Sequence, residues 1–182
     1  MADDSSPSLP SQQQQQQQHH ESLALMTDLY QLTMGQAYWM SGRANQEACF
    51  HLFYRRNPFK GGYCIAAGLE PAIQWLQSLR FTDDDLAYLA SLKGYDNNPL
   101  FDPGYLRYLH DDFKLDLNVD AVPEGTVIFA EEPLLRVTGS ILQAQLIETA
   151  LLSQINFSTL VATKAARVCS SAGEGFPVLE FG

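Results

Sequence analysis

The sequence predicts an α/β protein, with an N-terminal domain of helices and short antiparallel strands and then the start of a second α/β domain. Runs rich in aromatic and β-branched residues, typical of strands, are interleaved with segments of helical periodicity from residue 22 onward. The last residues, "GFPVLEFG" (175–182), form a Gly/Pro turn into an apolar run. A domain rarely stops on such a strand, because its hydrogen-bonding neighbours would be missing. We therefore expect the chain to be cut off as a new domain begins.

Composition and charge narrow the class of function. A hydrophobic share of 46% and a charged share of 18% over 182 residues are those of a globular protein with a sizeable core. The formal net charge of −10 argues against binding to nucleic acid or to a membrane surface, since both are anionic. No apolar run approaches the roughly 20 residues that span a bilayer. The acidic start "MADDSSPSLP" lacks the features of a signal peptide, so we expect a cytoplasmic protein.

The three cysteines give no sign of a cross-linked or metal-binding framework. Cys49, Cys64 and Cys169 are odd in number and widely spaced, and no CxxC pair occurs. This pattern indicates buried free thiols rather than disulfides or a zinc site.

The first part of the chain divides into a tail, a helix and a predicted hairpin. Residues 1–21, with seven consecutive glutamines at 12–18, are of low complexity and are expected to be disordered. A helix is expected to begin near Thr27, a good N-cap. Its predicted packing face carries Met26, Tyr30, Met34, Ala37 and Tyr38. "EACFHLFYRR" (47–56) and "YCIAAGL" (63–69) then predict two strands that form a hairpin around "NPFKGG".

Helices, strands and further helices follow. Helices are predicted at 69–79, at 82–92 (where Thr82 and Asp85 can form a capping box) and at 103–113, opened by Pro103. Residues 115–139 predict three short strands of a small antiparallel sheet or half-barrel. Residues 140–173 predict two helices broken near 156–158. The chain thus divides into a disordered Gln-rich tail (1–21), an N-terminal α/β domain (22–140), connecting helices (141–175) and the first strand of the next domain (176–182).

A group of basic residues could bind an anion. Arg55, Arg56 and Lys60 lie at a predicted strand end beside a Gly-Gly turn, in a chain with only 11 basic residues. They form either a phosphate clamp, since arginine forks match phosphate oxygens, or an exposed hairpin end made soluble by charge; both interpretations stay open. Lys164 and Arg167, three apart on a predicted helix, could also reach an anion, but a solvated helix face is the simpler interpretation.

The stretch "MTDLYQLTM" (26–34) places an acid and an aromatic two positions apart. Asp28 and Tyr30 would point to different sides of a regular helix. They converge on a ligand only if Asp28 lies at the frayed start of the helix. From the residues alone, Tyr30 is a core or interface aromatic whose hydroxyl lies at the edge.

Five stretches, in order, resemble nicotinate phosphoribosyltransferase. They are "LMTDLYQLTMGQAYW" (25–39), "FHLFYRRNPFKGGYCIAAGLEPAIQWL" (50–76), "VPEGTVIFAEEPLLRVTG" (122–139), "IETALLSQINFSTLVATKAAR" (147–167) and "VLEFG" (178–182). The resemblance implies an enzyme that joins nicotinate to phosphoribosyl pyrophosphate, with coupled ATP hydrolysis, to give nicotinate mononucleotide in the salvage of NAD. It also implies an N-terminal α/β domain before an incomplete α/β barrel, and a homodimer with shared active sites.

The resemblance also implies roles for particular residues. Asp28 is then catalytic, orienting groups near the reacting atoms, and Tyr30 stacks on the pyridine ring in the neighbouring subunit's site. Either Arg55 or Arg56 faces the substrate phosphate. Phe181, in the first barrel strand, covers the other face of the ring. Mg²⁺ and ATP are implied by the family, with ligands that do not belong to this segment.

The segments that follow the first barrel strand in the family are absent from the 182 residues. We therefore expect the chain to be inactive by itself. An alternative is a non-catalytic truncated form that dimerises with the full-length enzyme and modulates it. A third possibility, the related nicotinamide-specific branch, is disfavoured by "YRRNPF" and "EPLLRV".

Overall fold

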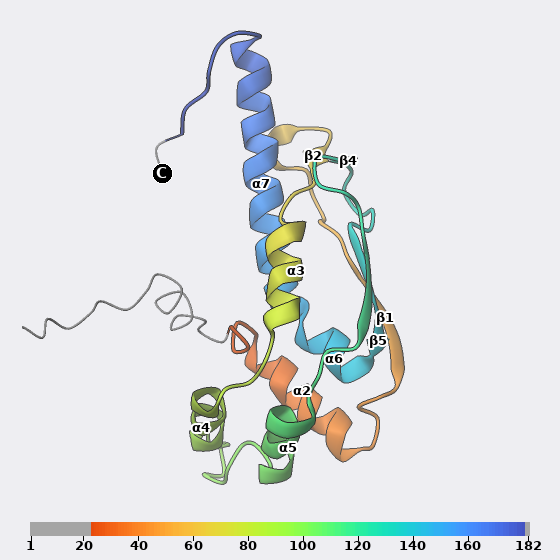
Figure 1. Cartoon of the computed structure of the whole chain (residues 1–182), viewed down its shortest axis with the longest axis vertical. Coiled ribbons are helices and arrows are strands. Elements are labelled where there is room, and N and C mark those ends of the chain that lie inside the picture. Colours follow the sequence, from red (N-terminus) through yellow and green to blue (C-terminus); the bar gives the residue numbers. More distant parts are fainter. Residues whose placement is uncertain (1–22, 181–182) are drawn as a thin grey trace, which may run out of the picture.

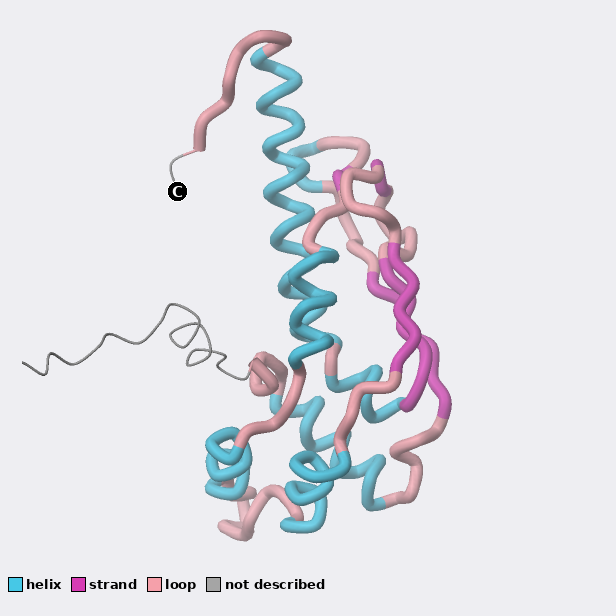
Figure 2. The backbone as a smooth tube through the Cα atoms, viewed as in Figure 1, coloured by secondary structure: helices cyan, strands magenta, loops and turns pink. Residues whose placement is uncertain are grey.

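A computed structural model describes residues 23–180 as an elongated body, built around one long helix (Figure 1). The Gln-rich tail and Phe181 lie outside the described residues. Figure 2 shows the strands as a narrow layer along one side of the body, with most of the helices on the other. The mixed α/β class predicted from the sequence is confirmed.

The strands form two small antiparallel sheets. In the first, the order is β1 (Glu47–Leu52), β5 (Leu135–Ser140) and β3 (Leu117–Ala121), with β5 in the centre. In the second, β2 (Cys64–Ile65) pairs with β4 (Val127–Ile128). The three strands predicted over 115–139 all form, and all their pairings are antiparallel.

The predicted hairpin between β1 and β2 is wrong. β1 pairs with β5 instead, in a register that sets Phe50 opposite Val137. The connection between β1 and β2 contains the 3₁₀ turn Pro58–Lys60, in which Phe59 and Lys60 have left-handed φ values of 56° and 53°. This turn redirects the chain before β2 begins. β5 carries the buried side chains of Leu135 and Val137. Pairing with β5 therefore lets β1 join the sheet where apolar surface is buried.

Most predicted helices form with the expected ends. They are α2 (Leu29–Met40), α3 (Leu69–Ser78), α4 (Asp83–Ser91), α5 (Pro103–Arg107) continued by a π-helical turn (Tyr108–Asp112), α6 (Ile141–Leu146) and α7 (Glu148–Ala172). At α4, Thr82 and Asp85 form the predicted capping box. Among residues 23–180, no helix has the length and apolar character needed to cross a bilayer.

The break in the last helical stretch lies elsewhere than predicted. The chain bends at Ile147, between α6 and α7, and runs through residues 156–158 as unbroken helix. Asn156 lies within α7 and lines a cavity. Ser158 packs against Gly68, where an added Cβ would come within 2.8 Å of the serine side chain. Polar residues in α7 thus serve contacts on its flank, not a helix end.

The buried apolar residues form two clusters that α6 connects. One lies between the sheets, α3 and α7, and includes Trp75 and Leu151; the other lies among α2, α4 and α5, and includes Leu89 and Tyr105. α6 is buried from Leu142 to Leu146, which suits a helix with apolar neighbours all round. Its Gln143 is satisfied by the backbone, accepting from Asp116 N–H and donating to the Lys114 carbonyl, each at 2.8 Å.

The prediction for the cysteines is correct in part. All three thiols are free, and Cys64 is buried beside Tyr54 in the first cluster. Cys49 and Cys169 are exposed, on the edge strand β1 and near the end of α7. The spacing of the cysteines in the sequence does not predict that Cys49 and Cys169 are exposed.

Gly35 and Tyr105 make a testable close contact. A Cβ on Gly35 would come within 2.5 Å of the Tyr105 hydroxyl, which is buried and has no partner among the described residues. We expect Gly35→Ala to lower the free energy of unfolding by about 1–2 kcal/mol in urea titrations, because of overpacking. In a Tyr105→Phe background the next atom is 3.6 Å away, so the same change should become neutral or stabilising through helix propensity. Equal destabilisation in both backgrounds would contradict this packing.

His110 makes stability depend on pH. Its ring nitrogens lie 2.6 Å from Asp111 Oδ1 and 3.2 Å from Asp83 Oδ1. The hydrogen bond to Asp111, aided by both carboxylate charges, raises the pKa of His110 above 6.5. Its stabilisation is thus complete below pH 6.5 and is lost as pH rises through the higher folded pKa. We expect the melting temperature to fall slightly between about pH 6 and about pH 8. His110→Gln should remove the decrease in melting temperature that is due to His110. The control His51→Gln should leave that decrease in place.

Candidate functional site

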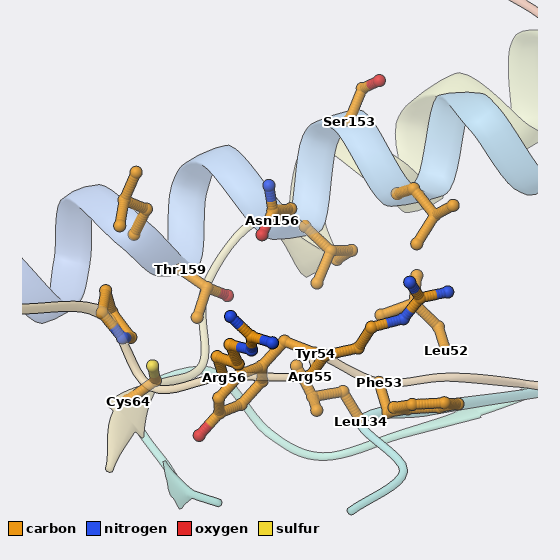
Figure 3. A pocket seen from close by; sticks show the side chains of 14 residues that line it. Leu52, Phe53, Tyr54, Arg55, Arg56, Cys64, Leu134, Ser153, Asn156 and Thr159 are labelled. Atoms are coloured by element: carbon orange, nitrogen blue, oxygen red, sulfur yellow. The ribbon is translucent and has the colours of Figure 1, made fainter. Parts of the chain in front are cut away.

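A cavity of about 550 Å³ lies between the segment that follows β1 and one face of α7 (Figure 3). Its apolar wall comes from both sides and contains Leu52, Phe53, Leu134, Leu152, Ile155 and Leu160. Polar groups from α7 also line it, namely Ser153, Asn156 and Thr159. A hollow of this size with a few converging polar groups is typical of a small-molecule site.

Arg55 and Arg56 supply positive charge to this cavity. Figure 3 shows both side chains extending from the segment after β1 toward α7. Neither guanidinium forms an ion pair within residues 23–180. Two unpaired cations beside amide and hydroxyl donors suit an anionic ligand such as a phosphate. The predicted hairpin does not exist, so the two arginines belong to a connection that lines a cavity and not to a hairpin end; their role as a phosphate clamp stays a prediction.

Lys164 and Arg167 contact the turn Pro58–Lys60, which follows Arg55 and Arg56 in the chain. They therefore do more than form a solvated face of α7. Arg167 Nη1 donates to the Phe59 carbonyl at 3.0 Å, and both cations lie over the Phe59 ring, at 5.0 and 5.9 Å from its centroid. An added Cβ on Gly61 would lie 1.8 Å from Arg167 Nη2, so a larger residue there would displace the Arg167 guanidinium. These contacts hold the left-handed turn Pro58–Lys60 against α7.

Asp28 and Tyr30 both lie at the start of α2 (Leu29–Met40). The N-cap is Asp28, not Thr27, and the Gln31 side chain accepts from the Asp28 N–H at 3.3 Å. The buried residues of α2 are Gln31, Leu32 and Gly35, so the predicted packing face is wrong: Tyr30 is 47% exposed. Tyr30 therefore presents an accessible ring on the outside of its own chain.

The first turn of α7 meets this helix start. The Tyr30 hydroxyl donates to Glu148 Oε2 at 3.1 Å, and the Thr149 hydroxyl lies 2.8 Å from Asp28 Oδ2. Partial burial, together with the hydrogen bond and charge of Glu148, raises the pKa of Tyr30 above 10. Tyr30 is therefore a neutral hydroxyl donor at physiological pH.

Glu148, the partner of Tyr30, lines a hollow together with Arg55. A second hollow of about 460 Å³ has both Arg55 and Glu148 in its wall, beside the aromatic rings of Phe50 and Phe53. Sequence reasoning missed Glu148 and Gln31, although both lie within the stretches that carry the family resemblance. Nothing in local spacing indicates that residues 117 or 118 positions apart would bond.

The last described residues differ from their prediction. Residues 176–180 form no strand, and the side chains of Phe176 and Leu179 are each 72% exposed. A strand needs a neighbour with which to exchange hydrogen bonds, and the described part of the chain places none beside this segment. Within residues 23–180, no three His, Cys, Asp or Glu side chains come together as a metal site.

Comparison with known proteins agrees with this fold. Residues 25–156 match the family model of the nicotinate phosphoribosyltransferase (NAPRTase) N-terminal domain. The chain is 43% identical over 169 residues to nicotinate phosphoribosyltransferase of Bacillus subtilis (strain 168), covering 89% of this chain and 31% of that protein. It is 42% identical over 158 residues to nicotinate phosphoribosyltransferase of Homo sapiens, covering 87% of this chain and 29% of that protein.

Solved structures show the same likeness. The crystal structure of human Nicotinic Acid Phosphoribosyltransferase matches with a TM-score of 0.75 and 42% identity, over 86% of this chain and 30% of that one. Nicotinate-nucleotide pyrophosphorylase from Pyrococcus furiosus matches with a TM-score of 0.57 at 19% identity, which shows likeness of fold alone. The class is therefore that of an N-terminal domain of the phosphoribosyltransferase type.

More particularly, this chain belongs to the nicotinate phosphoribosyltransferase family. It spans less than a third of the length of the curated relatives it matches.

The cavity predicts binding of an inorganic anion. We expect the chain to bind pyrophosphate in calorimetric titrations at low salt, and the affinity to fall as salt is added. Arg55→Ala or Arg56→Ala should each weaken binding by about tenfold or more, because a charge-assisted hydrogen bond is lost. Arg107→Ala, an exposed arginine on α5 remote from the cavity lining, is the matched control. Equal weakening by all three changes would mean that only overall charge matters.

Proposed function

We propose that this chain is the N-terminal part of an enzyme that joins nicotinate to phosphoribosyl pyrophosphate, with coupled ATP hydrolysis, giving nicotinate mononucleotide in NAD salvage. The observation that carries the proposal is the family match over residues 25–156, which contain both arginines and most of the other residues that line the cavity. The proposed location is the cytoplasm, in line with the free thiols.

The proposed chemistry is a displacement at the anomeric carbon of the ribose. The pyridine nitrogen forms a bond to this carbon, and pyrophosphate leaves with the electron pair of the broken C–O bond. Charge grows on the departing oxygens, so cations held nearby lower the barrier. Arg55 and Arg56, unpaired in their cavity, are the groups of this chain that would hold a phosphate of the substrate.

Asp28 and Tyr30 are proposed to act on the base. The exposed Tyr30 ring would stack on the pyridine in the site of a neighbouring subunit, with Asp28 orienting the groups beside it. The exposed apolar residues Leu29 and Met34 on the same helix support a subunit contact there. Phe181 keeps its proposed role on the opposite face of the ring.

Mg²⁺ and ATP belong to the proposal only through the family. Mg²⁺ would neutralise pyrophosphate charge when bound. The described residues offer no cluster that fits a protein-held metal ion, so no step is assigned to it on this chain. No residue of this chain is assigned to the coupling of ATP hydrolysis either.

An assay of nicotinate mononucleotide formation tests the proposal. We expect no turnover by the 182 residues alone, because they match only 31% of the Bacillus subtilis relative. A chimera, in which residues 1–182 replace the matching segment of that relative, should regain activity. Turnover by the isolated chain would refute the expected inactivity. A chimera that folds but is inactive, when the Bacillus subtilis relative is active in the same assay, would refute the proposed function.

The alternative is a non-catalytic chain that pairs with a full-length enzyme. The observation in its favour is the row of exposed apolar residues on α7, including Phe157 at 68% and Val161 at 50% exposure. The mass of the product in cells separates the two: a discrete species of 20.3 kDa that changes the rate of the longer enzyme would favour the alternative.

A further inference from the structure

We propose that Glu148 and Thr149, the first residues of α7, are positioning residues that hold Tyr30 and Asp28 ready for the substrate. The inference rests on the proposed function, which gives Asp28 and Tyr30 their roles. It adds two residues that touch neither the base nor the phosphate in that proposal. Hydrogen bonds join the start of α2 to the start of α7.

The Thr149 hydroxyl orients the Asp28 carboxylate. It has one proton and faces two acceptors, Asp28 Oδ2 at 2.8 Å and Gln31 Oε1 at 3.0 Å. The Gln31 oxygen already accepts from the Asp28 N–H and from the Thr27 hydroxyl. The carboxylate is the charged and closer acceptor, so the threonine proton goes to Asp28. A carboxylate held in this way cannot rotate freely at the exposed N-cap.

Glu148 anchors the hydroxyl end of Tyr30. Its Oε2 accepts from the Tyr30 hydroxyl at 3.1 Å and from Gln31 Nε2 at 3.0 Å. Gln31 is fully buried, so its amide is a fixed reference for the glutamate. The tyrosine ring is thereby tethered at its hydroxyl while about half of the residue stays exposed. Fixing a ring before a ligand arrives lowers the entropy that stacking would otherwise cost.

The placement of the network favours a role in the site over one in folding. Asp28, Tyr30 and Glu148 are exposed, and hydrogen bonds between exposed side chains add little to stability; the structural share of the network is the bond from the buried Gln31 amide to Glu148. Glu148 also lies in the wall of the hollow that contains Arg55. Glu148 thus bonds to the proposed base-stacking ring and lines a hollow that Arg55 also lines.

The first arm of the test uses the 182-residue chain and needs no activity. With ¹³Cζ-labelled tyrosine, NMR titration follows each phenol, and Tyr30→Phe identifies the signal of Tyr30. We expect the wild-type pKa of Tyr30 to lie above 10 and to fall toward 10 in Glu148→Ala. The control is Glu70→Ala, since Glu70 is likewise exposed in a first helical turn and accepts a side-chain amide bond, from Gln74 at 2.8 Å. An unchanged Tyr30 signal in Glu148→Ala would overturn the tether.

The second arm uses the active chimera. We expect Glu148→Ala to raise KM for nicotinate about tenfold with a smaller change in kcat. In a Tyr30→Phe background the same change should have little further effect on that KM, because the tethered hydroxyl is already gone. We expect Thr149→Val to lower kcat about tenfold and Thr149→Ser to restore it, while Glu70→Ala leaves both constants unchanged.

The outcomes separate this inference from the function on which it rests. An inactive wild-type chimera refutes the proposed function, and the NMR arm still decides whether Glu148 tethers Tyr30. An active chimera in which Glu148→Ala and Thr149→Val change neither constant refutes the positioning role alone. The positioning role is also overturned if activity falls only in step with thermal stability and the effects of Tyr30→Phe and Glu148→Ala are additive. The contact between Tyr30 and Glu148 would then be purely structural.

Discussion

Two buried threonines of α7 hold the short strand β2 and thereby set how the rest of the chain packs. Thr163 Oγ1 accepts from the Ile65 N–H at 2.9 Å, and Thr159 Oγ1 accepts from the Ala67 N–H at 3.2 Å. These hydroxyls satisfy one backbone donor of β2 and one of the segment that follows it. With β2 fixed on α7, the segment from β1 must cross the same helix face, and the arginine-lined cavity forms where it crosses.

The same helix supports the other predicted functional residues from its two ends. Its first turn bonds to Asp28 and Tyr30, and Arg167 near its end bonds to the turn at Phe59. At about 1.5 Å per residue, the helix from Glu148 to Arg167 connects two points roughly 28 Å apart along its axis. The supporting groups, such as Gln31 and Thr163, are buried, whereas the predicted ligand contacts are exposed. This division allows exposed groups to keep a defined geometry.

The correct predictions from sequence share a local cause. α3 and α4 form where periodicity and caps indicated them, since the capping box of Thr82 and Asp85 involves residues within one turn. The wrong ones depend on distant partners: β1 joined β5, and α7 continued past Asn156. For the site, the sequence pointed to Arg55, Arg56 and Tyr30, but it could not show that Glu148 lies beside Tyr30.

The sequence by itself determined the residue types at the site, the helices with local caps and, through five ordered stretches, the family. Only the tertiary structure decided which strand pairs with β1, which face of α2 is buried, and that Gln31 links Asp28 to Glu148. The reason is the range of the interactions. Helix signals are satisfied within four residues, whereas strand pairing and polar networks are decided by which distant segments bury the most apolar surface together.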